Sequence, residues 1–381
     1  MKIMLSAGEA SGDVHGENIA RAILAMAPET ELIGFGGSRM EDAGVRLRQN
    51  FADYSVMGVW EVLVNIRRLF RLLSDLTEFM KEEKPDMLVL IDYPDFNWRL
   101  AKKAKALGIP VFSYIPPSAW AWRKGRAKNC AKIADEFIAI FPHELPVYEQ
   151  AGAKISFVGN PLVDAVRPEL PRERARRFFR MPEDKAVVLL LPGSRRQEIE
   201  LLLPSMLEGA KKLLQERPET VLYLPVADTV SRERIEEMIA AADVPITLTD
   251  EKRYSLMAAA DAAMATSGTV VMEAALLGLP CVVLYRLSPV SYAIGKLLVH
   301  VENFSLPNIL LHEGFQTELL QDEVTADNIA REVARLYPGE QHRREVVEKL
   351  KLACSKLGAP GASGRVAERI LNAAREFAAA K

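Results

Sequence analysis

The chain has 381 residues, of which 49% are hydrophobic and 26% charged, and its formal net charge is −2. This composition excludes a disordered chain, which would combine low hydrophobicity with a large net charge, and the lack of a basic excess argues against a general nucleic-acid-binding protein. The cysteines, Cys130, Cys281 and Cys354, are far apart and odd in number, so they predict neither a disulfide scaffold nor a zinc ribbon and fit a reducing cytosol.

Short apolar runs alternate with helical patterns along the whole chain. Most of these runs are apolar throughout, as expected of parallel strands that helices cover on both faces. The alternation and the chain length together predict two doubly wound α/β domains. The predicted strands are 3–7, 31–35, 87–92, 111–115, 136–141 and 155–158 in the first series, and 186–191, 221–226, 246–248, 262–266 and 281–285 in the second.

The strongest boundary signal is the basic, proline-interrupted stretch over 167–180, just before the second series of strands. We therefore expect a first domain over 1–163 and a second over 164–352, with a helical tail over 353–381 that can pack back on the first domain. Open α/β sheets bind ligands beyond the carboxyl ends of their strands. Two such domains facing each other predict a ligand cleft between them.

The loop over 8–13 (GEASGD) joins the first predicted strand to a helix. Its G-x-x-x-G spacing differs from the dinucleotide fingerprint G-x-G-x-x-G, and its two carboxylates would repel a pyrophosphate. Two interpretations remain open. Either Ser11 or Asp13 caps the helix in a tight turn, or the loop, with Ser11 and Gly12, hydrogen-bonds a polyhydroxylated substrate.

A helix is predicted over 59–80, with one apolar stripe that is typical of ordinary core and a second apolar set outside it among arginines. Apolar and basic residues mixed on an outward face indicate an interfacial membrane contact; a helix buried on both sides or a dimer surface are the alternatives. The predicted core stripe is Val59, Val62, Leu63, Ile66, Leu69, Phe70, Leu73 and Leu76. The predicted outward set is Trp60, Val64, Leu72 and Phe79, with Arg67, Arg68 and Arg71.

Asp92 ends the predicted strand 87–92, in the segment IDYPDFN. At such a position a partly desolvated carboxylate would have a raised pKa and could act as a general base. The alternative is that Asp92 tethers the loop while Asp95 or Asn97 caps the next helix. After the following strand, Trp120 in PPSAWAWR either stacks on a sugar or seals the cleft, or else packs between the domains.

The segment LPGSRR over 191–196 joins a strand of the second series to a helix. Gly193 permits close approach of the backbone, the helix N-terminus offers free N–H groups, and Arg195, next to Ser194, supplies a bidentate guanidinium. These features suit a phosphate group. An ordinary helix cap explains the same residues.

A second loop of this kind follows the strand 262–266, where Ser267, Gly268 and Thr269 begin a helix. Small residues at a helix N-terminus suit a diphosphate, and Glu273, one turn further, could accept two hydrogen bonds from a ribose diol. Each loop alone is explained by ordinary capping, but the two together indicate a nucleoside diphosphate.

Several other chemistries are disfavoured by the motifs. The five histidines show no H-E-x-x-H or clustered spacing, so no metal site is expected. Neither G-x-S-x-G nor G-x-x-x-x-G-K-[ST] occurs, which argues against a serine hydrolase and a P-loop protein.

Taken in order, the motifs resemble those of the lipid-A-disaccharide synthase family of glycosyltransferases, over about residues 3 to 322. The resemblance implies a GT-B architecture of two Rossmann-like domains, without metal or cofactor. It implies transfer of 2,3-diacylglucosamine from its UDP donor to 2,3-diacylglucosamine 1-phosphate, with inversion, to give a β-1,6-linked disaccharide 1-phosphate and UDP. The motifs that carry it are GEASGD, VMGVWEVL, IDYPDFN, PSAWAWR, FVGNPLVD, LPGSRRQEIE, SGTVVMEAAL and SLPNIL.

The resemblance also implies roles for single residues. Asp92 matches the family's general base, and Glu9 lies in the loop on the acceptor side. The donor-binding positions are Arg195 with Ser194, Ser267, Gly268, Thr269, Glu273, Asn308 and Gln321. Two positions depart from the family pattern: Asn160 stands where His is expected, so no proton role falls there, and Pro116 stands where Ser is commoner.

The outward face of 59–80 matches a family region that touches the membrane. No apolar run of spanning length and no secretory signal are expected, so we expect a cytoplasmic protein peripheral to the inner face of the cytoplasmic membrane, as a possible homodimer. The alternatives are another GT-B UDP-sugar transferase, a UDP-GlcNAc epimerase, and, outside enzymes, a two-lobed solute-binding protein. An NAD-dependent oxidoreductase is the weakest alternative because the first loop lacks the fingerprint.

Overall fold

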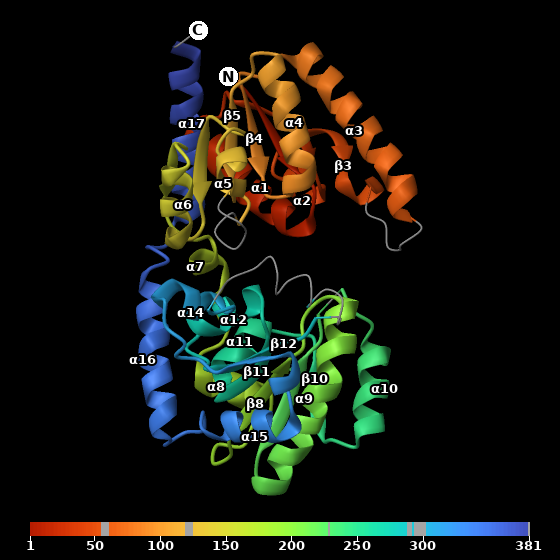
Figure 1. The fold of residues 1–381 in the computed structure, drawn as a ribbon, viewed down its shortest axis with the longest axis vertical. Coiled ribbons are helices and arrows are strands. Elements are labelled where there is room, and N and C mark those ends of the chain that lie inside the picture. The colour runs from red at the N-terminus through yellow and green to blue at the C-terminus, as the bar shows by residue number, and fades with distance from the viewer. Residues whose placement is uncertain (55–60, 119–124, 228, 288–291, 293–301, 380–381) are drawn as a thin grey trace. The chain divides into compact units, whose positions relative to one another are not determined.

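The structure, a computed structural model, describes residues 1–54, 61–118, 125–227, 229–287, 292 and 302–379 (Figure 1). The chain divides into two compact units. Unit 1 comprises Met1–Pro161 and Gly358–Lys381, and unit 2 comprises Leu162–Leu357. None of the helices within the described residues is long and apolar enough to cross a membrane.

Unit 1 is built on a parallel seven-stranded sheet in the order β3-β2-β1-β4-β5-β6-β7. The chain winds outward from β1 toward β3 and then from β4 toward β7, so the order reverses between β1 and β4. Ligands of open α/β sheets bind at such a reversal, beyond the carboxyl ends of the strands. The strands are β1 (Lys2–Ala7), β2 (Glu31–Gly36), β3 (Arg46–Asn50), β4 (Met87–Ile91), β5 (Val111–Tyr114), β6 (Glu136–Ala139) and β7 (Ile155–Phe157).

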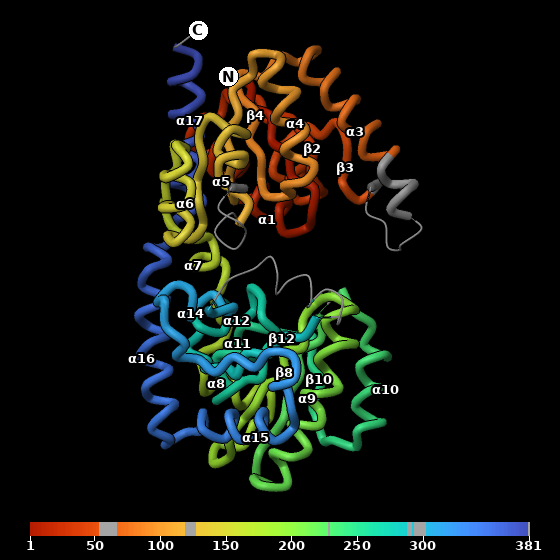
Figure 2. The backbone as a smooth tube through the Cα atoms, viewed as in Figure 1, coloured from red at the N-terminus to blue at the C-terminus, as the bar shows by residue number. Residues whose placement is uncertain are grey.

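Helices cover both faces of this sheet. Successive side chains of β1 point to opposite faces, so Ile3 and Leu5 join one apolar core and Met4 joins the other. The first core is closed by α1 (Ala10–Met26) and by α17 (Ala362–Ala379), which pack against each other (Figure 2). The second is closed chiefly by α3 (Glu61–Glu83) and α4 (Pro94–Ala106). The other helices are α2 (Ser38–Asp42), α5 (Gly125–Cys130) and α6 (Leu145–Gln150), with short 3-10 turns at Phe51–Tyr54 and Pro142–Glu144.

The buried stripe of α3 differs from the predicted one. Leu72 and Phe79, predicted to face outward, are 1% and 2% exposed in the core, whereas Phe70, predicted to be core, is 56% exposed. Apolar residues lie on both sides of the buried stripe. Periodicity alone therefore did not determine which face of the helix points into the core. Contacts with β3 help to set the rotation: the guanidinium of Arg48 lies 5.5 Å from the Phe79 ring centroid. Leu72 is therefore unavailable as a surface contact.

Unit 2 is built on a parallel six-stranded sheet in the order β10-β9-β8-β11-β12-β13, which reverses between β8 and β11. Its apolar core includes side chains of β8, β11 and β12 that pack against helices α11 and α12. Its strands are β8 (Val187–Leu191), β9 (Val221–Pro225), β10 (Ile246–Thr249), β11 (Ala262–Thr266), β12 (Cys281–Tyr285) and β13 (Glu318–Leu320). Its helices are α7 (Leu162–Ala165), α8 (Arg172–Phe178), α9 (Arg196–Glu216), α10 (Arg232–Ala242), α11 (Arg253–Ala259), α12 (Thr269–Leu276), α14 (Leu306–Leu311), α15 (Ala326–Ala334) and α16 (Gln341–Ser355).

The predicted fold class, two doubly wound α/β units, is confirmed. The predicted series lacked β3 and β13. Both are short strands at an edge of a sheet, and the sequence of β3, RLRQN, is mostly polar. Such strands lack the continuous apolar run by which buried parallel strands are recognised.

Candidate functional site

In unit 1, the loop after β1 and the loop after β4 meet at the reversal of strand order. The two loops lie so close together that only glycine fits at position 8. A Cβ added at Gly8 would lie 2.1 Å from Cδ1 of Tyr93. Burial first, and then the charges of Glu9 and Asp95, raise the pKa of the Tyr93 phenol. Glu9 and Ser11 are exposed here, while Gly12 is buried against the sheet.

Asp13, the last residue of GEASGD, is committed to structure. Its side chain does not cap α1; the carboxylate accepts hydrogen bonds from the backbone N–H groups of Gly37 at 2.8 Å, Met40 at 3.1 Å and Arg39 at 3.2 Å. These groups belong to the start of α2, where backbone donors lack partners within the helix. Asp13 therefore ties α1 to the loop that follows β2.

Asp92 lies directly after β4 with a left-handed backbone, φ +51°, and Tyr93 follows at φ +53°. Non-glycine residues adopt this conformation at a cost, and two hydrogen bonds hold it here. The Asp92 N–H donates to the Tyr114 carbonyl at 3.1 Å, and the Asn97 amide donates to the Asp92 carbonyl at 2.6 Å. Asn97 is fixed in turn, because its Oδ1 accepts from the Ser6 hydroxyl at 2.7 Å.

Burial raises the pKa of the Asp92 carboxyl, and the backbone N–H of Tyr93 lowers it in part. A carboxylate that is less well solvated holds a proton more strongly, so Asp92 is a better base than an exposed aspartate. This is the state expected of a general base at the carboxyl edge of a sheet.

Sequence reasoning missed two titratable groups near this edge of unit 1. Glu144 is 3% exposed and accepts a hydrogen bond from the Phe141 N–H at 3.2 Å; burial, and in smaller part the charge of Asp92, raise its pKa to about 8. Burial lowers the pKa of His15 to about 4, and its ring lies edge-on to Tyr114, with centroids 5.9 Å apart. The sequence offered one hint of Glu144, because it is an acidic residue just after the predicted strand 136–141. For His15 the sequence offered only its position shortly after GEASGD.

The two positions that depart from the family pattern are both buried. Asn160 is fully buried, and its side-chain amide donates to the Ile140 carbonyl at 2.8 Å. Pro116 is buried as well. Trp60 and Trp120 lie outside the described residues, as does the side chain of Val64.

In unit 2, a cavity of about 310 Å³ opens at the carboxyl ends of β8, β9 and β11, beside the reversal of strand order. It brings together most of the predicted donor residues. Those lining it are Ser194, Arg195, Ser267, Gly268, Thr269 and Glu273. Asn308 and Gln321 do not line it.

The two loops of this cavity have different backbones. Gly193 has φ +110°, and an added Cβ there would lie 2.3 Å from Oε2 of Glu198, so the turn requires glycine. Glu198 accepts from the N–H groups of Ser194 at 3.2 Å and Arg195 at 3.3 Å, while the Arg195 side chain is 80% exposed. Around Gly268 the space is open, which leaves the N-terminus of α12 accessible.

The residues outside the cavity are held by internal hydrogen bonds. Asn308 is fully buried; its amide donates to the Gln316 carbonyl and to Glu318, and its Oδ1 accepts from the Gln316 N–H. The Gln321 side chain exchanges hydrogen bonds with both backbone groups of Leu287. These hydrogen bonds give both residues a part in shaping loops, and their assignment as donor-binding positions stays a prediction.

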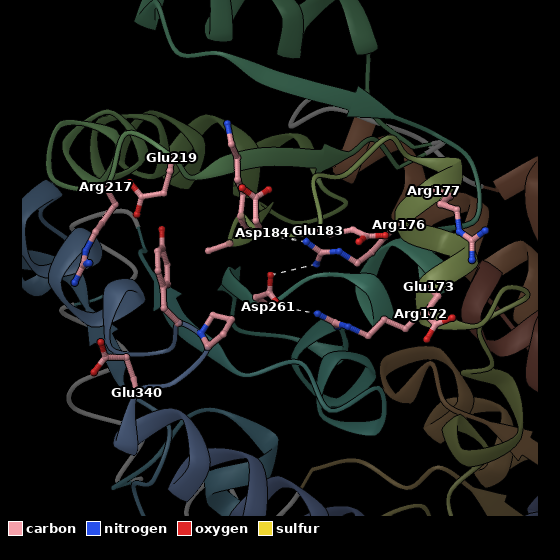
Figure 3. A pocket seen from close by; sticks show the side chains of 14 residues that line it. Arg172, Glu173, Arg176, Arg177, Glu183, Asp184, Arg217, Glu219, Asp261 and Glu340 are labelled. Atoms are coloured by element: carbon pink, nitrogen blue, oxygen red, sulfur yellow. Dashed lines mark hydrogen bonds and ion pairs between the residues drawn. The ribbon is translucent and has the colours of Figure 1, made fainter.

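A larger cavity, of about 730 Å³, lies at the opposite, amino-terminal edge of the same sheet (Figure 3). Its centre is the buried Asp261 carboxylate, which pairs with Arg172 at 2.6 Å and Arg176 at 3.3 Å and accepts from the Val187 N–H at 2.9 Å. These contacts fasten α8 to the sheet, so the charges have a structural explanation. The predicted donor residues are not among its lining.

Comparison with solved structures defines the class of fold. UDP-GlcNAc 2-epimerase from Neisseria meningitidis, solved bound to UDP-GlcNAc, matches with a TM-score of 0.67 at 16% identity, over 98% of this chain and 100% of that one. HepE of Anabaena, solved in complex with UDP and glucose, matches with a TM-score of 0.54 at 13% identity, over 98% and 100%. Two parallel α/β units of this kind constitute the GT-B fold.

The family follows from the sequence comparisons. The family model described as lipid-A-disaccharide synthetase matches residues 3–361. Lipid-A-disaccharide synthases from Geobacter sulfurreducens and Syntrophus aciditrophicus are 40% and 41% identical, over 97% and 96% of this chain and 96% of each relative. The chain belongs to the lipid-A-disaccharide synthetase family and is a glycosyltransferase of lipid A biosynthesis.

Proposed function

We propose that the enzyme transfers 2,3-diacylglucosamine from its UDP donor to the 6-hydroxyl of 2,3-diacylglucosamine 1-phosphate. The products are the β-1,6-linked disaccharide 1-phosphate and UDP, with inversion at the anomeric carbon. The observation that carries the proposal is the cavity at the carboxyl edge of the unit 2 sheet, where the motif residues of two separate loops line one space. The UDP-containing structures named above support a nucleotide there.

The donor is held, in this proposal, by the loops after β8 and β11. The N-terminus of α12 and the guanidinium of Arg195 face the diphosphate, which gathers negative charge as the bond to the sugar breaks. Preorganised N–H groups and a cation stabilise such charge without reorganising during the reaction. Glu273 binds the ribose hydroxyls. Arg195→Ala is therefore expected to weaken donor binding more than acceptor binding.

Asp92 acts as the general base on the acceptor hydroxyl. Its raised pKa supports this role because a more basic carboxylate takes the proton more readily as the oxygen attacks. The hydrogen bonds through Asn97 support it as well, since they fix the backbone from which the carboxylate projects. Glu9, exposed in the neighbouring loop, contacts the acceptor.

The reaction is tested by incubating the full chain with UDP-diacylglucosamine and diacylglucosamine 1-phosphate and measuring both UDP and disaccharide. Stoichiometric formation of the two is expected. Release of UDP without disaccharide, or epimerisation of UDP-GlcNAc at a comparable rate, would contradict the proposal and favour an epimerase. A deacylated acceptor of equal activity would indicate another UDP-sugar transferase.

We also infer that the enzyme is peripheral to the membrane and contacts it through the exposed face of α3. Arg67, Arg68 and Arg71 are exposed there, and Phe70 replaces the buried Leu72 as the apolar contact, with the Arg99 guanidinium 5.7 Å from its ring centroid. Each arginine near an anionic surface contributes about 1 kcal/mol of attraction.

The membrane contact is tested by sedimentation with vesicles of phosphatidylglycerol and of phosphatidylcholine. Binding to the anionic vesicles is expected to fall in Phe70→Ser and in Arg68→Gln. Phe178→Ser is the control, because Phe178 is a 46% exposed phenylalanine in unit 2. Equal binding of all variants would refute the contact.

A further inference from the structure

The carboxylate of Glu273 is held through one of its two oxygens. The Arg253 guanidinium donates to Oε1 at 3.2 Å, and the Tyr254 hydroxyl donates to the same oxygen at 3.1 Å. The Glu273 side chain is 10% exposed. Among the described residues, Oε2 has no hydrogen-bond partner, although Glu273 lines the cavity of unit 2.

The two donors support each other. The Arg253 guanidinium also donates to the Tyr254 hydroxyl at 2.9 Å and lies 4.8 Å from the centroid of the tyrosine ring. Hydrogen bonds to a charged acceptor are about twice as strong as neutral ones, and two of them at one oxygen restrict rotation of the glutamate side chain. Burial raises the pKa of Tyr254, as does, less strongly, the charge of Glu273, so the phenol stays a donor well above neutral pH.

We propose that Arg253 and Tyr254 are positioning residues that fix Glu273 so that its second oxygen faces the ribose, and that they thereby set the preference of the cavity for ribonucleotides over 2′-deoxyribonucleotides. The inference rests on the proposed binding of a UDP donor in this cavity. A carboxylate that is free to rotate accepts from the ribose in only some of its rotamers, and each rotamer that must be frozen on binding costs affinity. A fixed carboxylate avoids this loss for both hydroxyls of a ribose diol, whereas a 2′-deoxyribose offers it only the 3′-hydroxyl.

The inference is tested on the full chain by measuring dissociation constants for UDP and 2′-deoxy-UDP by calorimetry. The wild type is expected to bind UDP about 10- to 100-fold more tightly, the effect of one hydrogen bond to a charged group. Glu273→Gln should lose most of this ratio. Tyr254→Phe, which removes only the hydroxyl, should reduce it to about 3-fold or less, and Arg253→Lys should reduce it in part.

The matched control is Tyr223→Phe, because the Tyr223 hydroxyl bonds the Phe179 carbonyl elsewhere in unit 2 at 2.7 Å. Its ratio should equal that of the wild type. A wild-type ratio in Tyr254→Phe, with the ratio lost in Glu273→Gln, would overturn the inference and leave the proposed function standing. If Arg253→Lys raised the dissociation constants of both nucleotides by the same factor, Arg253 would contact the phosphates directly. That result would overturn its positioning role. Failure of the wild type to bind either nucleotide would overturn the proposed function and this inference with it.

Discussion

Glu144→Gln tests the buried carboxyl at the edge of the unit 1 sheet. The pKa of Glu144 rises from 4.5 in an unfolded chain to about 8 in the native state, so the native state binds the proton more tightly. The contribution of Glu144 to the stability of the native state is therefore complete below pH 4.5 and is lost as pH rises toward 8. Since each pKa unit corresponds to about 1.4 kcal/mol, the free energy of unfolding should fall by about 3–4 kcal/mol between pH 5 and pH 8.

The assay is urea unfolding of the wild type and of Glu144→Gln at several pH values in this range. Glutamine matches the shape of the neutral acid and does not titrate. The variant should therefore lose this part of the pH dependence, and its free energy of unfolding at pH 8 should be higher than that of the wild type. Glu149→Gln, at an exposed position on α6, is the control and should follow the wild type. Identical pH dependence in wild type and Glu144→Gln would refute the idea that Glu144 is buried as a neutral acid.

The interaction between Glu144 and Asp92 gives a second check on the same experiment. The charge of Asp92 contributes to the raised pKa of Glu144, although less than burial does. In an Asp92→Asn background, the pH at which Glu144 loses its stabilisation should therefore fall slightly. An unchanged midpoint would mean that the two carboxyl groups are too far apart to interact.

Two further variants probe unit 1. Asp92→Asn should bind UDP nearly as the wild type does while turnover falls about 10²- to 10⁴-fold; turnover near the wild-type rate would remove Asp92 as the base, and the exposed neighbour Asp95→Asn serves as control. Asp13→Ala should lower the free energy of unfolding by about 2–4 kcal/mol, because it leaves buried N–H groups of the α2 start without their acceptor, and Asp13→Asn should lose less. Urea unfolding that places Asp13→Ala within 0.5 kcal/mol of the wild type, the range of a neutral surface substitution, would contradict this role.

Much of the fold could be predicted because each buried parallel strand has its own continuous apolar run. The segments 87–92 and 186–191 show this, and the structure places β4 and β8 there. The edge strand β3 has no such run. Its pairing with β2 and the stacking of Arg46 and Arg48 on Phe79 are contacts between distant segments, and no local pattern contains them.

The candidate site follows the same division. The position of Asp92 could be predicted, because a residue after a buried strand must lie at the carboxyl edge of the sheet. The pKa of Glu144 could not, since it depends on burial by elements that are far apart in the sequence. The motif GEASGD combines both situations: its first carboxylate, Glu9, is exposed at the edge, and its second, Asp13, holds the start of α2.

The two units fix their candidate functional carboxylates in different ways, and this difference has a chemical reason. In unit 1 the Asn97 amide donates to the backbone carbonyl of Asp92, and the carboxylate accepts from the Tyr93 N–H, a neutral donor that lowers its pKa less than burial raises it; charged donors on the carboxylate would lower its proton affinity further and make a poorer base. In unit 2 the donors Arg253 and Tyr254 bind the carboxylate of Glu273 directly. A carboxylate that accepts hydrogen bonds from a ribose needs a fixed orientation, and two donors at one oxygen restrict its rotation. The partners of each carboxylate thus match its proposed role, which needs proton affinity at Asp92 and a fixed orientation at Glu273.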